Sequence, residues 1–249
     1  FHAYQHNGPC LPARAIYAVA QEIAIGSNLF YHFAGFPRMI HDLNFAQQGP
    51  EYFTILGIDP GSTTMGVSAM HVDFATLQIY GAELLTLHAL KPTGGRQINQ
   101  WMLDTHSERS MRLRELAWML GQQLMYQRPV FVACEAPFFN PRNPNAYQVL
   151  VETMKVIENT VYAWNPWRPL YRIETTVAKK AVAPKDPAGI LALKAIKDSK
   201  EKVRFCVERH PEVAKWVNYA IHDEHNVDAL IVAYAQLTRI RANDFSITF

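Results

Sequence analysis

The pattern of hydrophobic and polar positions changes near residue 50, and this change divides the chain. Residues 1–50 combine a helical stretch near Ala13–Ala24 with sequence that is rich in aromatic and turn-forming residues. From Tyr52 onward, short apolar runs end at turn signals, which is typical of buried strands, and longer segments place apolar residues on one helical face. We therefore interpret 1–50 as an N-terminal extension and 51–249 as one large domain.

The pattern predicts five strands and three long helices in this domain. The strands are expected over Tyr52–Ile58, Met65–His71, Leu77–Leu85, Val130–Cys134 and Pro169–Ile173. The helices are expected over Ser107–Gln127 with Ser107 as its cap, Tyr147–Tyr162 and Asn226–Arg241. Three strands that meander and two that return through helices predict an α/β fold, with a mixed five-stranded sheet flanked by helices.

Composition narrows the class of protein. Hydrophobic residues make up 49% and charged residues 18%, so the chain can bury a full core and is not a disordered tail. No apolar stretch reaches the roughly 20 residues that span a bilayer, so no membrane partner is expected. The three cysteines, Cys10, Cys134 and Cys206, form no CxxC pair and no even set. This is typical of an intracellular protein rather than of a secreted, disulfide-stapled domain.

The net charge of +2 hides an uneven distribution of charged residues. Residues 165–215 contain 12 Lys and Arg against 6 Asp and Glu, while the rest of the chain contains 12 against 16. A basic segment in an otherwise acidic chain is typical of a polyanion-binding protein with an acidic metal pocket. A solvated lysine-rich helix and loop gives the same distribution, and charge alone favours that simpler interpretation.

Three acidic residues lie at the ends of apolar elements. Asp59 ends the first predicted strand, Glu135 ends the fourth, and Asp228 is expected in the first turn of the last helix. Taken singly, Asp228 is better interpreted as a helix cap. For Asp59, a turn-forming role before Pro60 is about as well supported as a catalytic role. Together, as partly buried carboxylates on neighbouring elements, they favour a divalent-metal site. Oxygen ligands of this kind suit Mg²⁺ or Mn²⁺ rather than zinc.

A fourth ligand could come from the residues just before Asp228. His225 lies three residues before it and Glu224 four residues before it, so both share its helical face. The sequence leaves the choice between them open.

Several motifs, in order along the chain, resemble those of a known family. The run Ile55–Ser62 (ILGIDPGS) is similar to the first-strand motif of the RuvC family of Holliday junction resolvases, which belongs to the RNase H-like nucleases. The runs Ala133–Phe138 and His225–Leu230 resemble the second and last motifs of the family. The resemblance covers about Tyr52 to Ile240 and implies an RNase H-like fold.

The resemblance implies a metal-dependent endonuclease that resolves four-way (Holliday) junctions by paired, symmetrical phosphodiester hydrolysis. It implies that Asp59, Glu135 and Asp228, together with His225, are catalytic and hold two Mg²⁺ ions, for which Mn²⁺ substitutes. It also implies a homodimer, because a junction with two-fold symmetry needs two active sites in one complex. The helix over Tyr147–Tyr162 would then be the dimer interface, or it simply covers the sheet.

The same resemblance implies which residues contact DNA. Lys179 would stabilise the scissile phosphate, with Lys180 beside it and Lys202 as a second lysine site. Phe138, three residues after the second carboxylate, would help to open the junction, and Arg142 would hold a phosphate near it. Such an enzyme would act where the cell keeps its DNA, in the cytoplasm or nucleoid or in an organelle.

The chain departs from the family pattern in three places. Residues 1–50 have no counterpart in the minimal family fold. The segment Pro184–Ala195 reads as an insertion between the two lysine sites. His225 stands in a position where an aspartate also occurs in the family, and the histidine removes one formal charge from the pocket.

Other interpretations of the same residues are available. The phosphate loop of actin, Hsp70 and sugar kinases also resembles Gly57–Ser62, but those folds need a second phosphate loop, and the chain has no second motif of that kind. A junction-binding protein without catalysis would gain nothing from a buried acidic cluster that repels phosphate. A related RNase H-like nuclease acting on flaps, forks or RNA would share all of these residues.

Overall fold

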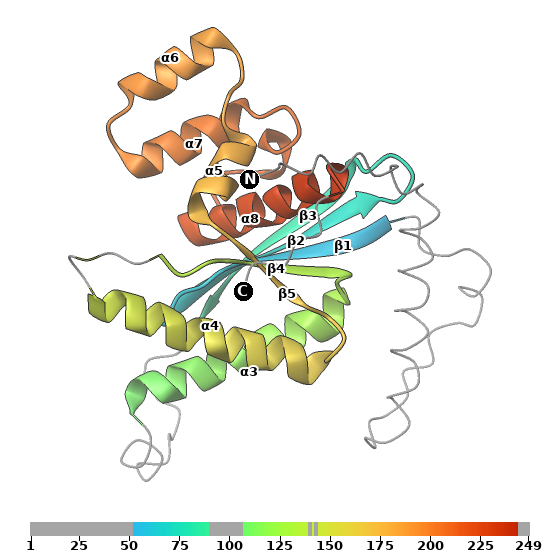
Figure 1. Ribbon diagram of the computed structural model, residues 1–249, viewed down its shortest axis with the longest axis vertical. Helices are drawn as coiled ribbons and strands as arrows, with labels where there is room; N and C mark the ends of the chain where they lie inside the picture. The colour runs from blue at the N-terminus through green and yellow to red at the C-terminus, as the bar shows by residue number, and fades with distance from the viewer. Residues whose placement is uncertain (1–51, 90–106, 139–140, 142–143, 244–249) are drawn as a thin grey trace, which may run out of the picture.

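A mixed five-stranded sheet forms the centre of this computed structural model, which describes residues 52–89, 107–138, 141 and 144–243 (Figure 1). The strands are β1 Tyr52–Asp59, β2 Thr64–Asp73, β3 Ile79–His88, β4 Phe131–Glu135 and β5 Leu170–Ile173. Their order is β3-β2-β1-β4-β5; β2 is antiparallel to β1 and β3, whereas β4 is parallel to β1 and β5. The predicted mixed sheet is confirmed.

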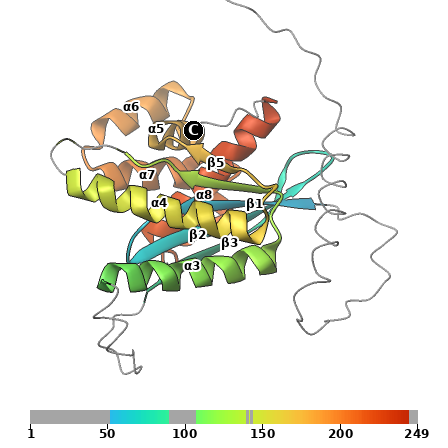
Figure 2. The same ribbon diagram turned by 60° about the horizontal axis from the view of Figure 1, so that its bottom comes forward.

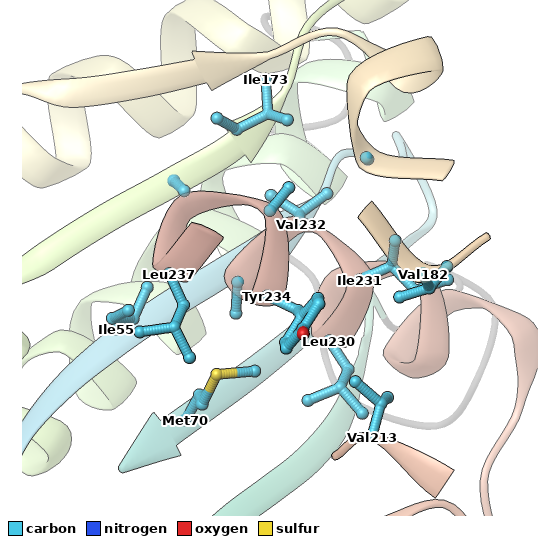
Figure 3. Close-up of a cluster of buried hydrophobic side chains, with 14 of the residues drawn as sticks. Ile55, Met70, Ile173, Val182, Val213, Leu230, Ile231, Val232, Tyr234 and Leu237 are labelled. Carbon is cyan, nitrogen blue, oxygen red and sulfur yellow. The ribbon is translucent and has the colours of Figure 1, made fainter. Parts of the chain in front are cut away.

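Helices cover both faces of the sheet (Figures 1 and 2). One face carries α3 Glu108–Gln127 and α4 Pro144–Trp164, and the other carries α8 Glu224–Arg241 with α5 Thr175–Val182, α6 Pro187–Ala195, α7 Ser199–Arg209 and the 3-10 helix η3 Ala214–Trp216. Each face has its own buried core, because strand side chains alternate between them. In β1, Ile55 packs toward α8 near Leu237, as Figure 3 shows, while Leu56 packs toward α3 and α4.

The backbone of α8 lies against the backbones of β1 and β2. A Cβ atom on Gly57 would stand 2.1 Å from the carbonyl oxygen of Ala229, and one on Gly66 would stand 1.9 Å from that of His225. Only glycine permits this approach at both positions. The two glycines therefore bring the first turns of α8 to the end of β1 where Asp59 lies.

The three predicted long helices are confirmed, with ends shifted by a few residues. Ser107 caps α3 as expected, because its side-chain oxygen accepts a hydrogen bond from the Ser110 amide at 3.3 Å. In α4, Ile157 and Val161 are buried on the sheet, whereas Val151 is 40% exposed. The helix thus covers the sheet with one side and leaves apolar surface on another.

The cap of α8 differs from the expectation. Its N-cap is Asp223, whose carboxylate accepts a hydrogen bond from the Asn226 amide at 3.0 Å, and the helix begins at Glu224. The prediction that Asp228 lies in the first turn is wrong, and the alternative interpretation of Asp228, taken alone, as a helix cap is excluded. Asp228 lies one turn further along, where its carboxylate is free of the backbone amides that a cap would bind.

The structure adds three helices that the hydrophobic pattern did not predict, namely α5, α6 and α7. None of them is longer than 11 residues, so a periodic apolar stripe does not stand out in the lysine-rich sequence. Capping residues could have indicated where α6 and α7 begin. Asp186 accepts a hydrogen bond from the Gly189 amide, and Asp198 accepts one from the Lys200 amide. The segment read as an insertion, Pro184–Ala195, contains α6.

Some predictions fall on residues 1–50, which lie outside the described residues, so the N-terminal extension and its boundary stay predictions. In the described part of the chain, Cys134 and Cys206 are free and buried. No helix in that part has both the length and the apolar character needed to cross a membrane.

Candidate active site

Two of the predicted carboxylates lie at neighbouring strand ends. Asp59 ends β1 and Glu135 ends β4, and these parallel strands pair Ile58 with Cys134. Ile58 and Cys134 belong to the core beneath α3 and α4. Because strand side chains alternate, Asp59 and Glu135 both turn toward the opposite face, which α8 covers.

His225 of α8 contacts the first of these carboxylates. Its Nδ1 lies 2.9 Å from Oδ2 of Asp59, and its Nε2 lies 3.2 Å from Oγ1 of Thr64. A carboxylate only accepts hydrogen bonds, so Nδ1 donates to Asp59, and in the neutral ring Nε2 accepts from the Thr64 hydroxyl. The hydrogen bond to Asp59 raises the pKa of His225 above its ordinary value.

The three carboxylates also act on one another. Burial is the main cause that raises the pKa of Glu135 to about 7, and the charges of Asp59 and Asp228 raise it further. The Thr175 hydroxyl has the opposite effect, because it donates a hydrogen bond to the Glu135 carboxylate. Burial and the charge of Asp59 raise the pKa of Asp228 to about 6, against the charge of Lys179, which lowers it. These effects of like charge indicate that the carboxylates from β1, β4 and α8 lie near one another in a partly buried region.

A divalent cation fits the chemistry of this site. Partly buried carboxylates that repel one another are stabilised by a cation, and oxygen ligands suit Mg²⁺ or Mn²⁺. In the part of the chain that the structure describes, no three His, Cys, Asp or Glu side chains already form a metal-binding group. Asp59, Glu135, Asp228 and His225 thus offer the right kind of donor atoms without the finished arrangement of a coordination shell.

The two candidates for a fourth ligand have different contacts. Oε2 of Glu224 pairs with Nζ of Lys200 on α7 at 2.5 Å, and nearly half of the Glu224 side chain is exposed. His225 contacts Asp59 directly. The geometry therefore favours His225 over Glu224 as the fourth candidate ligand. The ion pair of Glu224 instead links α8 to α7.

The predicted DNA contacts that the structure describes lie on α5, on α7 and after β4. Lys179 and Lys180 are exposed on α5, and Lys179 acts electrostatically on Asp228. Lys202 lies on α7 and is half-buried. Phe138 is 67% exposed shortly after β4. Arg142 lies outside the described residues.

Sequence reasoning missed two threonines of the site. Thr64 begins β2, and Thr175 begins α5 directly after β5. Neither belongs to an acidic motif, and each lies far along the chain from its hydrogen-bond partner. The fold brings Thr64 to His225 and Thr175 to Glu135. The antiparallel register, which sets Asp59 opposite Gly66, is the one feature that would have pointed to Thr64.

Comparison with known proteins supports this fold. No family model matches the chain, and no curated protein matches its sequence. Among solved structures, the chain is similar to RuvC of Thermus thermophilus, with 22% identity and a TM-score of 0.52, over 77% of this chain and 97% of that one. A second structure, of T. thermophilus RuvC in complex with a Holliday junction substrate, gives 19% identity and a TM-score of 0.50 over the same shares. The predicted RuvC-type, RNase H-like fold is confirmed.

Proposed function

We propose that this protein is a metal-dependent, structure-selective DNA endonuclease that resolves four-way junctions by paired, symmetrical hydrolysis as a homodimer. The observation that carries the proposal is that Asp59 and Glu135 end neighbouring parallel strands, with His225 of α8 hydrogen-bonded to Asp59. The charges of Asp59 and Lys179 act on Asp228, so this third carboxylate lies near the same site. The fold adds support, because the T. thermophilus protein of the same fold has been solved with a Holliday junction substrate. A protein that only binds DNA has no use for a partly buried acidic cluster at its binding surface.

Each residue of the site has a distinct part in this chemistry. Bound Mg²⁺ or Mn²⁺, held by Asp59, Glu135, Asp228 and His225, would supply neutralisation of the charge on the attacking and leaving oxygens. Lys179 would place a further positive charge on the scissile phosphate. Without the ion, the imidazole of His225 orients the Asp59 carboxylate through the hydrogen bond from Nδ1, and to bind the ion the ring would give up the hydrogen bond that Nε2 accepts from Thr64.

The proposed DNA surface is formed by residues of α5, of α7 and of the segment after β4. Lys180 and Lys202 extend the positive charge of Lys179 along α5 and α7 and would contact backbone phosphates. Phe138, exposed three residues after β4, would stack on a base at the crossover, and Arg142 would hold an adjacent phosphate. For the dimer, α4 offers Val151 and Tyr162, which are 40% and 65% exposed.

The proposal is tested with a panel of labelled substrates. Purified protein is incubated with an immobile four-way junction, linear duplex, a flap and an RNA–DNA hybrid, each with and without Mg²⁺. Paired nicks at symmetrical positions on the junction alone, only with the metal, would support the proposal. Binding without cutting in any divalent metal would favour an architectural protein, and preferential cutting of flaps or hybrids would replace the substrate while keeping the site.

A further inference from the structure

The helix α6 carries an apolar surface that the proposed mechanism does not use. Ile190 is 40% exposed and Leu191 is 72% exposed. Pro187 and Lys194 share their side of the helix, because these four residues are spaced three, four and seven apart. The opposite side of α6 faces the protein, since Leu193 packs against the core beneath α8 and Gly189 is buried. We call Pro187, Ile190, Leu191 and Lys194 the α6 outer face.

The charges around the α6 outer face are positive and largely unpaired. Between residues 179 and 202 the chain has seven lysines and three acidic residues. Two of the acids, Asp186 and Asp198, are occupied in capping α6 and α7. Among the described residues, no carboxylate forms an ion pair with Lys185, Lys194 or Lys197.

The helices on either side of α6 are fixed to the active site. Thr175, the first residue of α5, donates a hydrogen bond to Glu135. Lys200 of α7 pairs with Glu224, the neighbour of His225, at 2.5 Å. Figure 1 shows α5, α6 and α7 together on the α8 side of the sheet, with α6 farthest from the strands. The α6 outer face therefore lies on the same side of the sheet as the carboxylates, which is the side where we place the DNA.

We propose that the α6 outer face is a second DNA contact, in which Ile190 and Leu191 enter the groove of a duplex arm while Lys194 and its neighbouring lysines bind the flanking phosphates. This inference rests on the proposed function, since it assumes DNA at the carboxylates. Apolar side chains flanked by positive charge suit DNA, because proteins insert such side chains between base steps while lysines neutralise the backbone. A phosphate-rich partner explains both the exposed apolar pair and the unpaired lysines around it.

The test measures DNA binding by full-length protein that carries Asp59→Asn, so that the substrate stays intact. Adding Ile190→Ser with Leu191→Ser is expected to raise the Kd for a labelled four-way junction about tenfold, as burial of one large apolar side chain implies. The melting temperature should fall only slightly, since Leu191 is 72% exposed and Ile190 is 40% exposed. Tyr126→Ser on α3 is the matched control, because Tyr126 is 74% exposed on the other side of the sheet, and its Kd should not change.

Salt dependence separates the apolar part of the contact from the charged part. In a plot of the logarithm of the association constant against the logarithm of the salt concentration, Lys194→Gln should make the negative slope less steep by about one, as the loss of one phosphate contact predicts. The Ile190/Leu191 variant should instead lower the affinity and leave the slope unchanged.

Three results would overturn the inference. If the Ile190/Leu191 variant binds junction as tightly as its parent while the unaltered protein cuts junctions, the α6 outer face is not a DNA contact and the proposed function stands. If this variant instead loses binding to vesicles with anionic lipids at unchanged DNA affinity, the face binds membranes. If the unaltered protein binds no DNA, the inference and the proposed function both fail.

Discussion

The imidazole of His225 bridges the Asp59 carboxylate, 2.9 Å from Nδ1, and the Thr64 hydroxyl, 3.2 Å from Nε2. The three residues come from α8, β1 and β2, and the bare backbones of Gly57 and Gly66 let α8 approach closely enough to join them. A hydrogen-bonded chain thus holds the ring between two strand ends. It fixes the direction of the carboxylate that we place at the centre of the site.

Thr64→Val should slow junction cleavage by about three- to tenfold, because the ring of His225 loses the hydroxyl that orients it, and one neutral hydrogen bond has about that value. Binding of the junction should be unchanged. The measurement is the single-turnover cleavage rate beside that of Thr63→Val, whose side chain is exposed and next to Thr64 in the sequence. Equal loss in both variants would mean that the loop, and not the hydrogen bond, is what matters.

In metal-free protein, thermal stability should fall as the pH rises from about 4 to about 7. The pKa values of Glu135 and Asp228 are raised to about 7 and about 6, from ordinary values of 4.5 and 3.8. The folded protein therefore binds more protons than the unfolded chain in this window, and losing those protons destabilises it. Melting temperatures with EDTA between pH 4 and pH 8 measure this trend.

Mg²⁺ should reverse the effect, raising the melting temperature more at pH 8 than at pH 5, because the ion replaces protons that have been lost. Glu135→Gln is the control variant, and both its pH dependence and its response to Mg²⁺ should be smaller. An equal Mg²⁺ response at both pH values, or an identical response in the variant, would count against a carboxylate site for the ion.

Gly57→Ala should destabilise the protein by about 1–3 kcal/mol or more, because the new methyl group would overlap the Ala229 carbonyl and force α8 away from β1. Chemical denaturation measures the loss. Gly121→Ala is the matched control: its Cβ would meet only Thr160 Cγ2, at 3.9 Å, and a helical glycine gains roughly 0.5–1 kcal/mol from alanine. If both variants lose stability alike, the close approach of α8 is not what requires glycine at position 57.

Phe138→Ala should impair opening of the junction while leaving the melting temperature unchanged, since the ring is 67% exposed. The readout is the fluorescence of 2-aminopurine placed at the crossover, which rises when the base unstacks. Tyr80→Ala, which removes a ring that is 72% exposed on β3, should leave the signal intact. Normal opening and cutting by Phe138→Ala would remove this residue from the proposed DNA surface.

The sequence predicted the parts of the fold that have a strong repeating pattern. The five strands and the helices α3, α4 and α8 were visible because each is a short apolar run bounded by turn signals or a long apolar stripe. Helices α5 to α7 were not, since they are short and their positions are largely held by caps such as Asp186 and Asp198. Asp228 was misplaced for a related reason: Asp223, an earlier acid, is the residue that caps α8.

The candidate site shows the same division. The sequence singled out Asp59, Glu135 and Asp228 because charges beside apolar runs are costly without a partner, and the structure brings these three together. Thr64 and Thr175 were missed because an uncharged hydroxyl group costs much less to bury than a carboxylate and therefore does not stand out beside an apolar run. The position of Thr64 depends on the register between β1 and β2, and that of Thr175 depends on the path of the chain from β4 through α4 and β5 to α5. No local sequence pattern encodes either.

The most direct test of the central claim uses a supercoiled plasmid that extrudes a four-way cruciform. With Mg²⁺, a dimer that makes paired nicks within one complex should convert the plasmid to linear molecules, and Asp59→Asn should bind the cruciform without cutting it. Cutting by Asp59→Asn at the unaltered rate, or nicked circles as the only product of the unaltered protein, would contradict the proposal.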